Sequence, residues 1–164
     1  MGDIDIRDAG AADAAAICEI YNQGIEDRVA TLETELRTPP ERAEWMAVRS
    51  PRHPVIVAEA GGQVVGWASL NRFNPRPAYD HVADLSVYIE RSWRGRGVGR
   101  RLLARIIEIA RALSYHKVVL AAFPTNTAGM ALYERMGFTR VGIYREQGRL
   151  DGAWVDVIVM EQIL

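Results

Sequence analysis

Residues 81–103 read HVADLSVYIERSWRGRGVGRRLL, which combines an alternating segment, a glycine-rich turn and the start of an apolar stripe. Polar and apolar residues alternate over 82–89, which is typical of a strand with one face buried. Behind the glycines, apolar residues recur at helical spacing, namely Val98, Leu102, Ile106, Ile109 and Leu113. The stretch is therefore predicted to form a strand, a tight turn and a long amphipathic helix.

The turn between this strand and this helix is suited to hold an anion. Backbone N–H groups at the start of a helix are unpaired, and the helix dipole favours negative charge there. Glycines at 95, 97 and 99 let the backbone approach a ligand, and the five arginines of 91–103 can bond phosphate oxygens. Glycine raises the entropy cost of ordering the backbone, so three glycines within five residues are unfavourable unless they serve a purpose. They therefore favour an anion cradle over a solvated arginine-rich turn.

Other anion-binding motifs fit this turn poorly. A Walker loop needs lysine and then serine or threonine after its last glycine, whereas Arg100 and Arg101 follow Gly99. A dinucleotide fingerprint starting at Gly95 would need glycine where Arg100 stands, and no acidic residue lies at the ribose distance of about 20 residues. Aromatic residues near the turn are limited to Trp93, which argues against a nucleic-acid site.

Further strands and helices are predicted on both sides of this stretch. Strand candidates are IDIR, PVIVAEA and QVVGWASL around Gly61-Gly62, KVVLAAF, FTRVGIYRE, and AWVDVIVMEQIL after GRLDG. Helices are predicted over AADAAAICEIYNQGI, PERAEWMAVR and NTAGMALYERMG, the last ended by Gly137. Strands come first in hairpins and later alternate with helices. We therefore expect one domain over 1–164 of the α/β (α+β) class, with a mixed, twisted sheet covered by helices on both faces.

Composition indicates an ordinary globular protein. Hydrophobic residues make up 49% of the chain, and 20 basic residues face 21 acidic ones, so the arginine cluster is local. The first residues are acidic where a signal peptide is basic, and no apolar run approaches the roughly 18 residues of a membrane span. The single cysteine fits a reducing compartment. We expect a cytoplasmic protein that binds neither nucleic acid nor membrane.

Cysteine and histidine, which often carry chemistry, are poorly placed for it here. Cys18 lies on an apolar helical stripe and is most simply a core residue. His53, His81 and His116 are scattered without ligand spacing, so no metal is expected.

The segment Arg94-Gly95-Arg96-Gly97-Val98-Gly99 resembles the Arg/Gln-x-x-Gly-x-Gly/Ala signature of the GCN5-related N-acetyltransferases (GNAT). Over nearly the whole chain, further segments resemble one branch of that family, the phosphinothricin, methionine sulfoximine and arsinothricin N-acetyltransferases. These segments are IYNQGIEDRVATLETELRTP, VVGWASL, the loop ending RPAY, LSVYI, and NTAGMALYERMGF with GRLDGAWVDV. The resemblance implies a sheet with a V-shaped opening between two central strands.

The resemblance also implies that acetyl-CoA is the cosubstrate. In the family, the glycine-arginine signature cradles the pyrophosphate, and main-chain groups matching 85–88 bond the pantetheine and the acetyl carbonyl. The implied cofactor-binding residues are Leu85, Ser86, Val87, Tyr88, Arg94, Gly95, Arg96, Gly97, Val98, Gly99, Arg100 and Asn126.

Acetyl transfer to an amine needs a base for the ammonium proton and an acid for the leaving thiolate. Asp84 shares a strand face with Ser86 and Tyr88, and burial at a pocket would raise its pKa and suit it as a base. Its alternative role is a solvated acid or an ion-pair partner. By resemblance, the family's general base, usually glutamate, falls on Asp84, whose shorter side chain favours a bridging water.

Asn126 and Tyr133 are seven residues apart in one predicted helix and therefore lie on the same side. Asn126 can simply cap the helix, and Tyr133 can simply pack in the core. By resemblance, Asn126 contacts CoA and Tyr133 protonates or orients the thiol, although several relatives have histidine there.

The loop NRFNPRPAYD (71–80) holds residues suited to a substrate carboxylate, namely Arg72, Arg76 and Tyr79. Two prolines restrict the loop, although soluble surface arginines are the simpler interpretation of its composition. In the family, this loop and the segment matching Glu26 to Glu35 shape the amino-acid pocket. Relatives often carry an aromatic residue where Leu32 stands.

The main hypothesis is an acetyl-CoA-dependent N-acetyltransferase that acetylates the α-amine of a small amino acid or toxic analogue by direct transfer. A second hypothesis keeps the fold and changes the amine to a polyamine, an aminoglycoside or a protein N-terminus. A third is a non-enzymatic nucleic-acid or regulatory module built on the basic turn. A homodimer is expected from the family alone.

Overall fold

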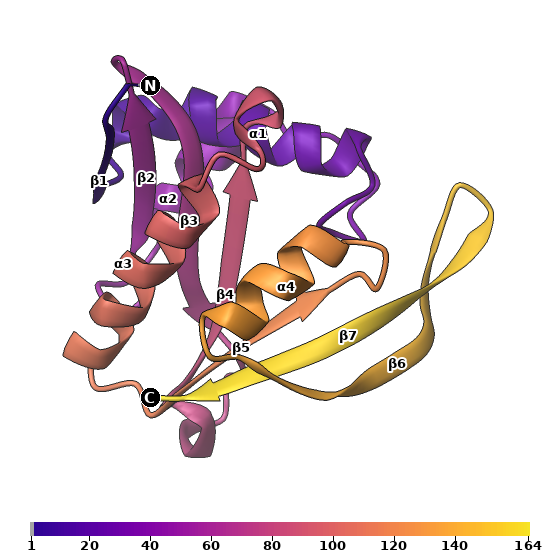
Figure 1. The fold of residues 1–164 in the computed structure, drawn as a ribbon. Helices are drawn as coiled ribbons and strands as arrows, with labels where there is room; N and C mark the ends of the chain where they lie inside the picture. The colour runs from indigo at the N-terminus through magenta and orange to yellow at the C-terminus, as the bar shows by residue number, and fades with distance from the viewer. Residues whose placement is uncertain (1) are drawn as a thin grey trace.

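A mixed sheet of seven strands runs through the computed structural model, which describes residues 2–164, in the order β1-β2-β3-β4-β5-β7-β6 (Figure 1). The strands are β1 (Ile4–Asp8), β2 (Val55–Ala60), β3 (Gln63–Arg72), β4 (Val82–Ile89), β5 (Lys117–Ala122), β6 (Thr139–Leu150) and β7 (Ala153–Ile163). Each strand that the sequence predicts is present.

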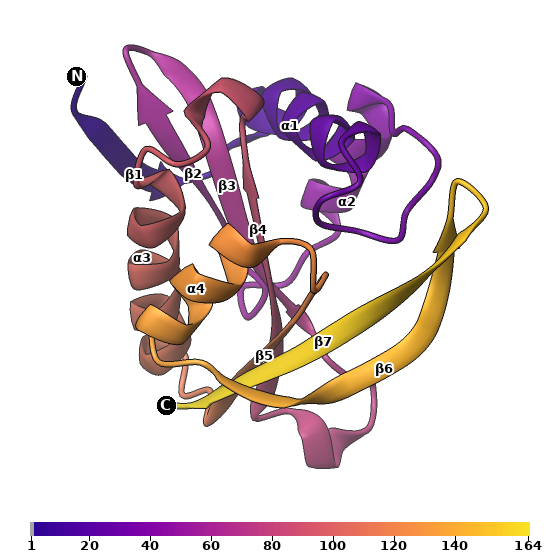
Figure 2. The same ribbon diagram turned by 45° about the vertical axis from the view of Figure 1, so that its right-hand side comes forward.

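Helices cover both faces of the sheet, which confirms the expected fold class (Figure 2). They are α1 (Ala14–Glu26), α2 (Pro39–Ala47), α3 (Val98–Ala112) and α4 (Thr127–Arg135). The first two pack on the face that carries Trp67, and the last two on the face that carries Leu70. Across residues 2–164, no helix is both long and apolar enough to span a membrane.

Strands β4 and β5 form the parallel pair at the centre of the sheet, and they separate soon after they meet. Their pairing runs from Val82 opposite Lys117 to Asp84 opposite Val119. Beyond Asp84, β4 continues to Ile89 while β5 turns away toward β7 (Figure 1). This is the V-shaped opening that the family resemblance implies, and Asp84 stands at its vertex.

The end of β3 differs from the sequence prediction. The sequence predicts Asn71 and Arg72 in the proline-bearing loop 71–80, but they continue the antiparallel ladder with β4, opposite Asp84 and Ala83. The ladder extends through them because backbone pairing does not depend on apolar side chains. Asn71 is thereby placed beside Asp84.

Candidate active site

A cavity of about 790 Å³ lies beside the second half of β4, beyond the point where β4 and β5 separate. Its walls come from the end of α1, the following loop, the second half of β4, the glycine-rich turn and α4. The residues that line it are Ile20, Gly24, Val29, Ala30, Val87, Tyr88, Ile89, Trp93, Arg94, Gly95, Gly97, Gly99, Arg100, Asn126, Ala128, Gly129, Leu132, Tyr133, Arg135 and Met136. An apolar channel therefore ends at a basic, glycine-rich turn.

The backbone of this turn requires glycine at two positions. Gly95 and Gly97 have φ values of +75° and +85°, a conformation that side chains with a Cβ rarely adopt. Gly97 is also the N-cap of α3, and no atom lies within 4 Å of where its Cβ would stand. Gly97, Gly99 and Arg100 all line the cavity, so the start of α3 lies beside it.

Gly99 serves a different purpose, since it lets α3 and α4 approach each other. A Cβ at this position would lie 3.0 Å from the side chain of Leu132. Asn126 caps α4 by accepting a 3.0 Å hydrogen bond from the N–H of Gly129. Gly99, Asn126 and Gly129 line the cavity, so the starts of α3 and α4 both lie beside it.

Two arginines of the turn are held by an acid at the end of α1. Arg94 donates a 2.7 Å hydrogen bond to Asp27, and Arg91 bonds the same carboxylate at 2.8 and 2.9 Å. Hydrogen bonds from Arg91 and then Arg94 lower the pKa of Asp27 against the effect of burial. The carboxylate thus orients Arg94 before any ligand arrives.

Asp84 does not line the cavity itself but lies at the vertex of the opening. Burial raises the pKa of its carboxyl to about 6, while a side-chain hydrogen bond from Asn71 acts in the opposite direction. A carboxyl whose pKa lies near neutrality can both take up and release a proton under physiological conditions. The role of Asp84 as the base stays a prediction.

Tyr133 lines the cavity from α4. Its ring packs edge-on against Phe138, with 6.1 Å between ring centroids, and burial raises the pKa of its phenol. A phenol with a raised pKa keeps its proton at neutral pH and can donate it.

The cavity collects most of the cofactor-binding residues that the sequence predicts. Those that line it are Val87, Tyr88, Arg94, Gly95, Gly97, Gly99, Arg100 and Asn126. The side chains of Leu85 and Val98 are buried in the core instead, so only their backbone groups can serve a ligand. Ser86 is hydrogen-bonded by Asn71, and Arg96 stacks over Trp93 at 5.3 Å beside a second, shallower cavity.

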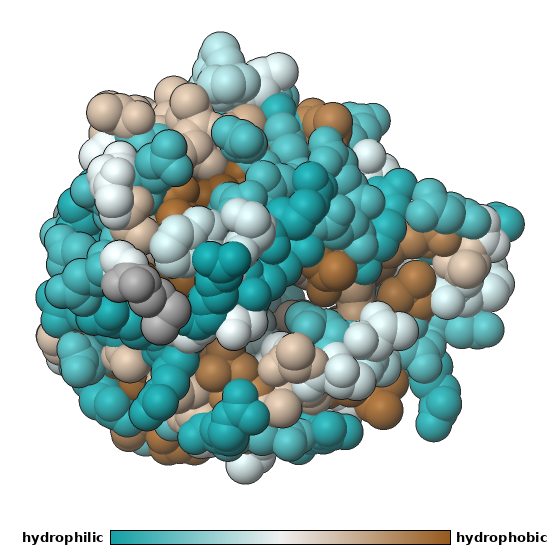
Figure 3. Space-filling model, turned by 45° about the horizontal axis from the view of Figure 1, so that its top comes forward, coloured by the Kyte–Doolittle hydropathy of each residue, from teal (hydrophilic) through white to brown (hydrophobic). Residues whose placement is uncertain are grey.

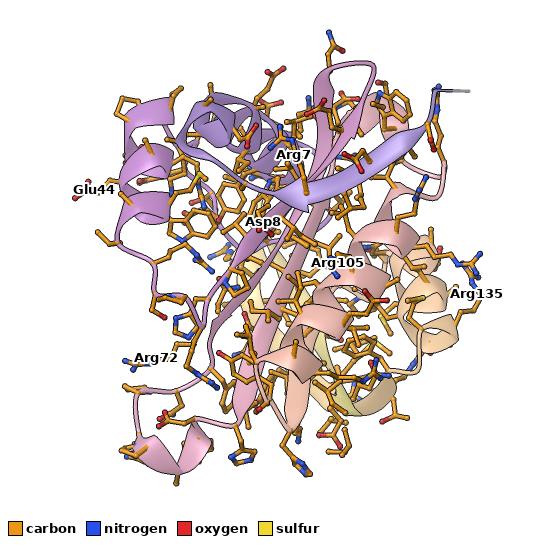
Figure 4. The ribbon with its side chains drawn as sticks, turned by 90° about the vertical axis from the view of Figure 1, so that its left-hand side faces the viewer. Arg7, Asp8, Glu44, Arg72, Arg105 and Arg135 are labelled. Atoms are coloured by element: carbon orange, nitrogen blue, oxygen red, sulfur yellow. The ribbon has the colours of Figure 1, made fainter. Side chains whose placement is uncertain are left out.

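The predicted substrate-binding loop lies apart from this cavity. Arg72, Arg76 and Tyr79 are exposed and line neither cavity, and Arg72 points away from the sheet (Figure 4). Tyr79 packs against Phe73 at 5.6 Å.

Sequence reasoning missed the wall of the cavity that α1 contributes. Gly24 lies so close to the ring of Tyr88 that a Cβ there would come within 3.2 Å of it. No local pattern signals such a contact, because the two residues lie far apart in the chain. Val29 and Ala30 belong to the segment 26–35, which the family resemblance already associates with the pocket.

Within the described chain, no three histidine, cysteine, aspartate or glutamate side chains are grouped so that they could hold a metal ion. Cys18 is buried, and its thiol donates a 3.2 Å hydrogen bond to the carbonyl of Arg37.

Residues 16–138 match the model of the acetyltransferase (GNAT) family. This chain belongs to that family. Over 158 residues it is 34% identical to an L-methionine sulfoximine/L-methionine sulfone acetyltransferase of Pseudomonas paraeruginosa, covering 95% of this chain and 92% of that one. Like its family, it is an acetyl-CoA-dependent N-acetyltransferase.

Two solved structures of other N-acetyltransferases share its fold closely. A phosphinothricin acetyltransferase from Sinorhizobium meliloti in complex with acetyl-CoA has a TM-score of 0.93 and 29% identity, covering 98% of this chain and 88% of that one. A ribosomal-protein-alanine N-acetyltransferase from Brucella melitensis has a TM-score of 0.94 and 38% identity, covering 98% of this chain and 99% of that one.

Proposed function

We propose that this GNAT enzyme acetylates the α-amine of a small amino acid or toxic amino-acid analogue of the phosphinothricin, methionine sulfoximine or arsinothricin type. The observation that carries the proposal is Asp84, a buried carboxyl with a pKa of about 6 at the point where β4 and β5 separate. Relatives named for phosphinothricin and methionine sulfoximine support the substrate class.

The cavity suits acetyl-CoA at both ends. Gly95 and Gly97 leave room for a ligand beside the start of α3, and Arg94 and Arg100 bring positive charge to the pyrophosphate. The apolar walls from β4 and α4 suit the pantetheine arm. When bound, acetyl-CoA supplies the acetyl group as an activated thioester.

In this proposal Asp84 accepts the proton of the substrate ammonium, through a bridging water because its side chain is short. Backbone N–H groups of residues 85–88 stabilise charge on the acetyl oxygen. Tyr133 donates its phenolic proton to the departing thiolate sulfur and is reprotonated from solvent. Transfer is direct, because the thiol of Cys18 is buried away from the cavity.

The substrate carboxylate is proposed to bind at the end of β3 and in the loop that follows it. Among residues 2–164, the guanidinium groups of Arg72 and Arg76 make no ion pair, so both are available for a bidentate bond to a carboxylate. Tyr79 lies on the same exposed loop.

A panel of acceptor amines tests the proposed function. Release of free CoA thiol is measured with phosphinothricin, methionine sulfoximine, ordinary amino acids, a polyamine, an aminoglycoside and a peptide that begins with alanine. The highest kcat/KM is expected for an amino-acid analogue. Activity confined to the peptide would instead support acetylation of protein N-termini, the second candidate, which the 38% identical Brucella melitensis enzyme favours.

Replacing Tyr133 with phenylalanine is expected to lower kcat about 100-fold and to change the KM for acetyl-CoA little. The phenol that protonates the thiolate is lost, whereas the ring still packs on Phe138. Steady-state kinetics check this, with Tyr144→Phe, an exposed tyrosine on β6, as the matched control. An unchanged kcat in Tyr133→Phe would assign the proton to another group.

The enzyme is also proposed to be a homodimer that uses the β6–β7 hairpin. This hairpin projects from the sheet (Figure 1), and hydrophobic residues are exposed on the projecting part of the molecule (Figure 3). The exposed side chains of the hairpin include Val141, Ile143 and Trp154. Exposed apolar side chains of this size along one element are typical of a surface that a partner covers.

The substitution Ile143→Asp is expected to shift the protein from dimer to monomer, because it buries an unpaired charge in the proposed interface. Light scattering after size exclusion measures the mass. The control is Val48→Asp, which changes a 76% exposed valine next to α2 and should leave the mass unaltered. A monomeric starting protein would refute the proposal outright.

A further inference from the structure

The loop after α1 contributes a wall of the cavity and is fixed to the turn that follows β4. Residues 27–32, which we call the wall segment, form neither helix nor strand, and Val29 and Ala30 line the cavity. At the start of the segment, Asp27 accepts a 2.7 Å hydrogen bond from Arg94 of the turn. The segment therefore begins on the β4 side of the opening between β4 and β5.

The other end of the wall segment is seated on strands across that opening. Leu32 packs against a buried cluster made by Phe123, which follows β5, with Leu150 of β6 and Val157 of β7. It also lies directly on Gly148 of β6, because a Cβ there would overlap one methyl group of Leu32 and lie 2.7 Å from the other. Only glycine leaves room for this close approach. The wall segment thus bridges the two sides of the opening.

The shape of β6 supports the contact between Gly148 and Leu32. The ladder between β6 and β7 shifts in register between Tyr144 and Gly148, and within this irregularity the N–H of Glu146 donates a 2.7 Å hydrogen bond to Asp156. Such bulges bend a strand and redirect the residues that follow. In Figure 2 the far end of the β6–β7 hairpin reaches toward the loop after α1.

A second contact joins the wall segment to the tip of the hairpin. Arg28 donates two hydrogen bonds of 3.0 Å to the carboxylate of Asp151, 123 residues away. Both residues have left-handed backbone, with φ of +54° and +49°, which a residue other than glycine keeps only where its surroundings hold it. The Asp151 side chain is 69% exposed, and exposed ion pairs contribute little free energy. The ion pair therefore orients the segment, and the packing of Leu32 anchors it.

We infer that Leu32 and Gly148 are positioning residues for the cavity wall: they seat the wall segment on the hairpin, which keeps Val29 and Ala30 in place and excludes water from the bound thioester. The inference rests on the proposed function in that acetyl-CoA occupies this cavity, and it is independent of the acceptor amine. A closed site suppresses hydrolysis of a reactive group.

The reaction that the wall would suppress is hydrolysis of acetyl-CoA. Water attacks the acetyl carbonyl carbon and the C–S bond breaks. Acetate and CoA thiol are released, and the protons of water pass to sulfur and to solvent. This reaction needs no acceptor, so it reports on the wall alone.

The inference is tested with Gly148→Ala, whose methyl group takes space that Leu32 occupies. Cγ of Leu32 would lie 3.1 Å from the new methyl carbon, so rotating the end of the side chain does not relieve the clash. At saturating acetyl-CoA without acceptor, kcat for release of CoA thiol is expected to rise about tenfold. The ¹H–¹⁵N signals of residues 28–32 are expected to shift. A merely structural role would lower this rate or leave it unchanged, and either result would overturn the inference.

Gly142→Ala is the matched control for this variant. Gly142 lies on the same strand, but a Cβ there would meet no atom within 4 Å. The hydrolysis rate and the signals of the wall segment should therefore stay as in the wild type. An equal rise in hydrolysis in both variants would overturn the inference, because the contact with Leu32 would not be its cause.

The contact itself is tested with Leu32→Ala, alone and together with Gly148→Ala. Leu32→Ala removes the three atoms nearest to the new methyl group and should itself raise hydrolysis, because the anchor is lost. In that background Gly148→Ala should change the rate less than about twofold, whereas additive increases would overturn the inference. If Gly148→Ala does not fold, Leu32→Ala decides alone, and hydrolysis at the wild-type rate would count against the anchor.

Asp151→Asn tests the ranking of the two contacts. Asparagine tolerates the left-handed backbone of this position and removes the charge that pairs with Arg28. Because the ion pair is exposed, hydrolysis should rise less than about threefold. A rise as large as that of Leu32→Ala would overturn the assignment of Leu32 as the anchor.

Titration of the wild type with CoA separates this inference from the proposed function. Bound CoA should shift the ¹H–¹⁵N signals of residues 95–99 and of residues 28–32. If neither set shifts, CoA does not occupy the cavity, and the proposed cofactor site and the inference fail together. If both sets shift but Gly148→Ala and Leu32→Ala hydrolyse acetyl-CoA no faster than the wild type, the inference alone fails and the proposed cofactor site stands.

Discussion

Asp84→Asn is expected to lower kcat by about 10²- to 10⁴-fold while acetyl-CoA binds with unchanged affinity. The substitution keeps the shape of the side chain and removes the group proposed to accept the ammonium proton. Asp84 does not line the cavity, so the surface proposed to bind acetyl-CoA is preserved. Steady-state kinetics and calorimetric titration with acetyl-CoA measure the two effects separately.

The pH dependence of the same pair of proteins gives a second readout. Because the pKa of Asp84 is about 6, its carboxylate is protonated below that pH, and wild-type kcat/KM should fall about tenfold per pH unit there. The residual kcat/KM of Asp84→Asn should not show this fall at low pH. If kcat/KM of the variant still falls below about pH 6, another group is the base.

The substitution Asp84→Asn should raise the free energy of unfolding at neutral pH, although it lowers activity. A carboxyl whose pKa is raised by folding binds its proton more tightly when folded, so stability is lost as pH rises from the unfolded value of 3.8 to about 6. Asparagine carries no such cost. At pH 7, Asp84→Asn should therefore be more stable than wild type, by up to about 3 kcal/mol, as thermal or urea unfolding can measure.

Gly97→Glu is expected to weaken acetyl-CoA binding by at least about 100-fold, because it puts a negative charge in the cradle proposed for the pyrophosphate. The φ of +85° adds backbone strain of about 1–2 kcal/mol, which lowers the free energy of unfolding. Calorimetric titration measures affinity, and thermal unfolding measures stability.

Gly62→Glu is the matched control for that experiment. Gly62 has a φ of +80° and, like Gly97, has no atom within 4 Å of where its Cβ would stand, but it lies in the β2–β3 hairpin turn. Both variants should lose similar stability, and only Gly97→Glu should lose affinity. Equal acetyl-CoA affinity in the two variants would remove this turn as the binding site.

Much of the site was predictable because it is built locally. The glycine-rich turn, the start of α3 and the cap of α4 by Asn126 each depend on residues that are close in sequence. Left-handed backbone and helix starts have residue preferences that do not depend on what packs around them. The two different roles of the glycines were not predictable, because Gly99 serves a contact with Leu132 on another helix.

The sequence by itself determined the order of strands and helices, the glycine-rich turn before α3 and the candidacy of Asp84. Only the tertiary structure decided what surrounds Asp84, because the register of β3 on β4 sets Asn71 beside it and the packing of α2 brings Arg49 to Asn71. It also decided that Gly24 forms a wall of the cavity against Tyr88. Local patterns report backbone preference and burial, whereas contacts between distant segments depend on register and packing, which no short stretch encodes.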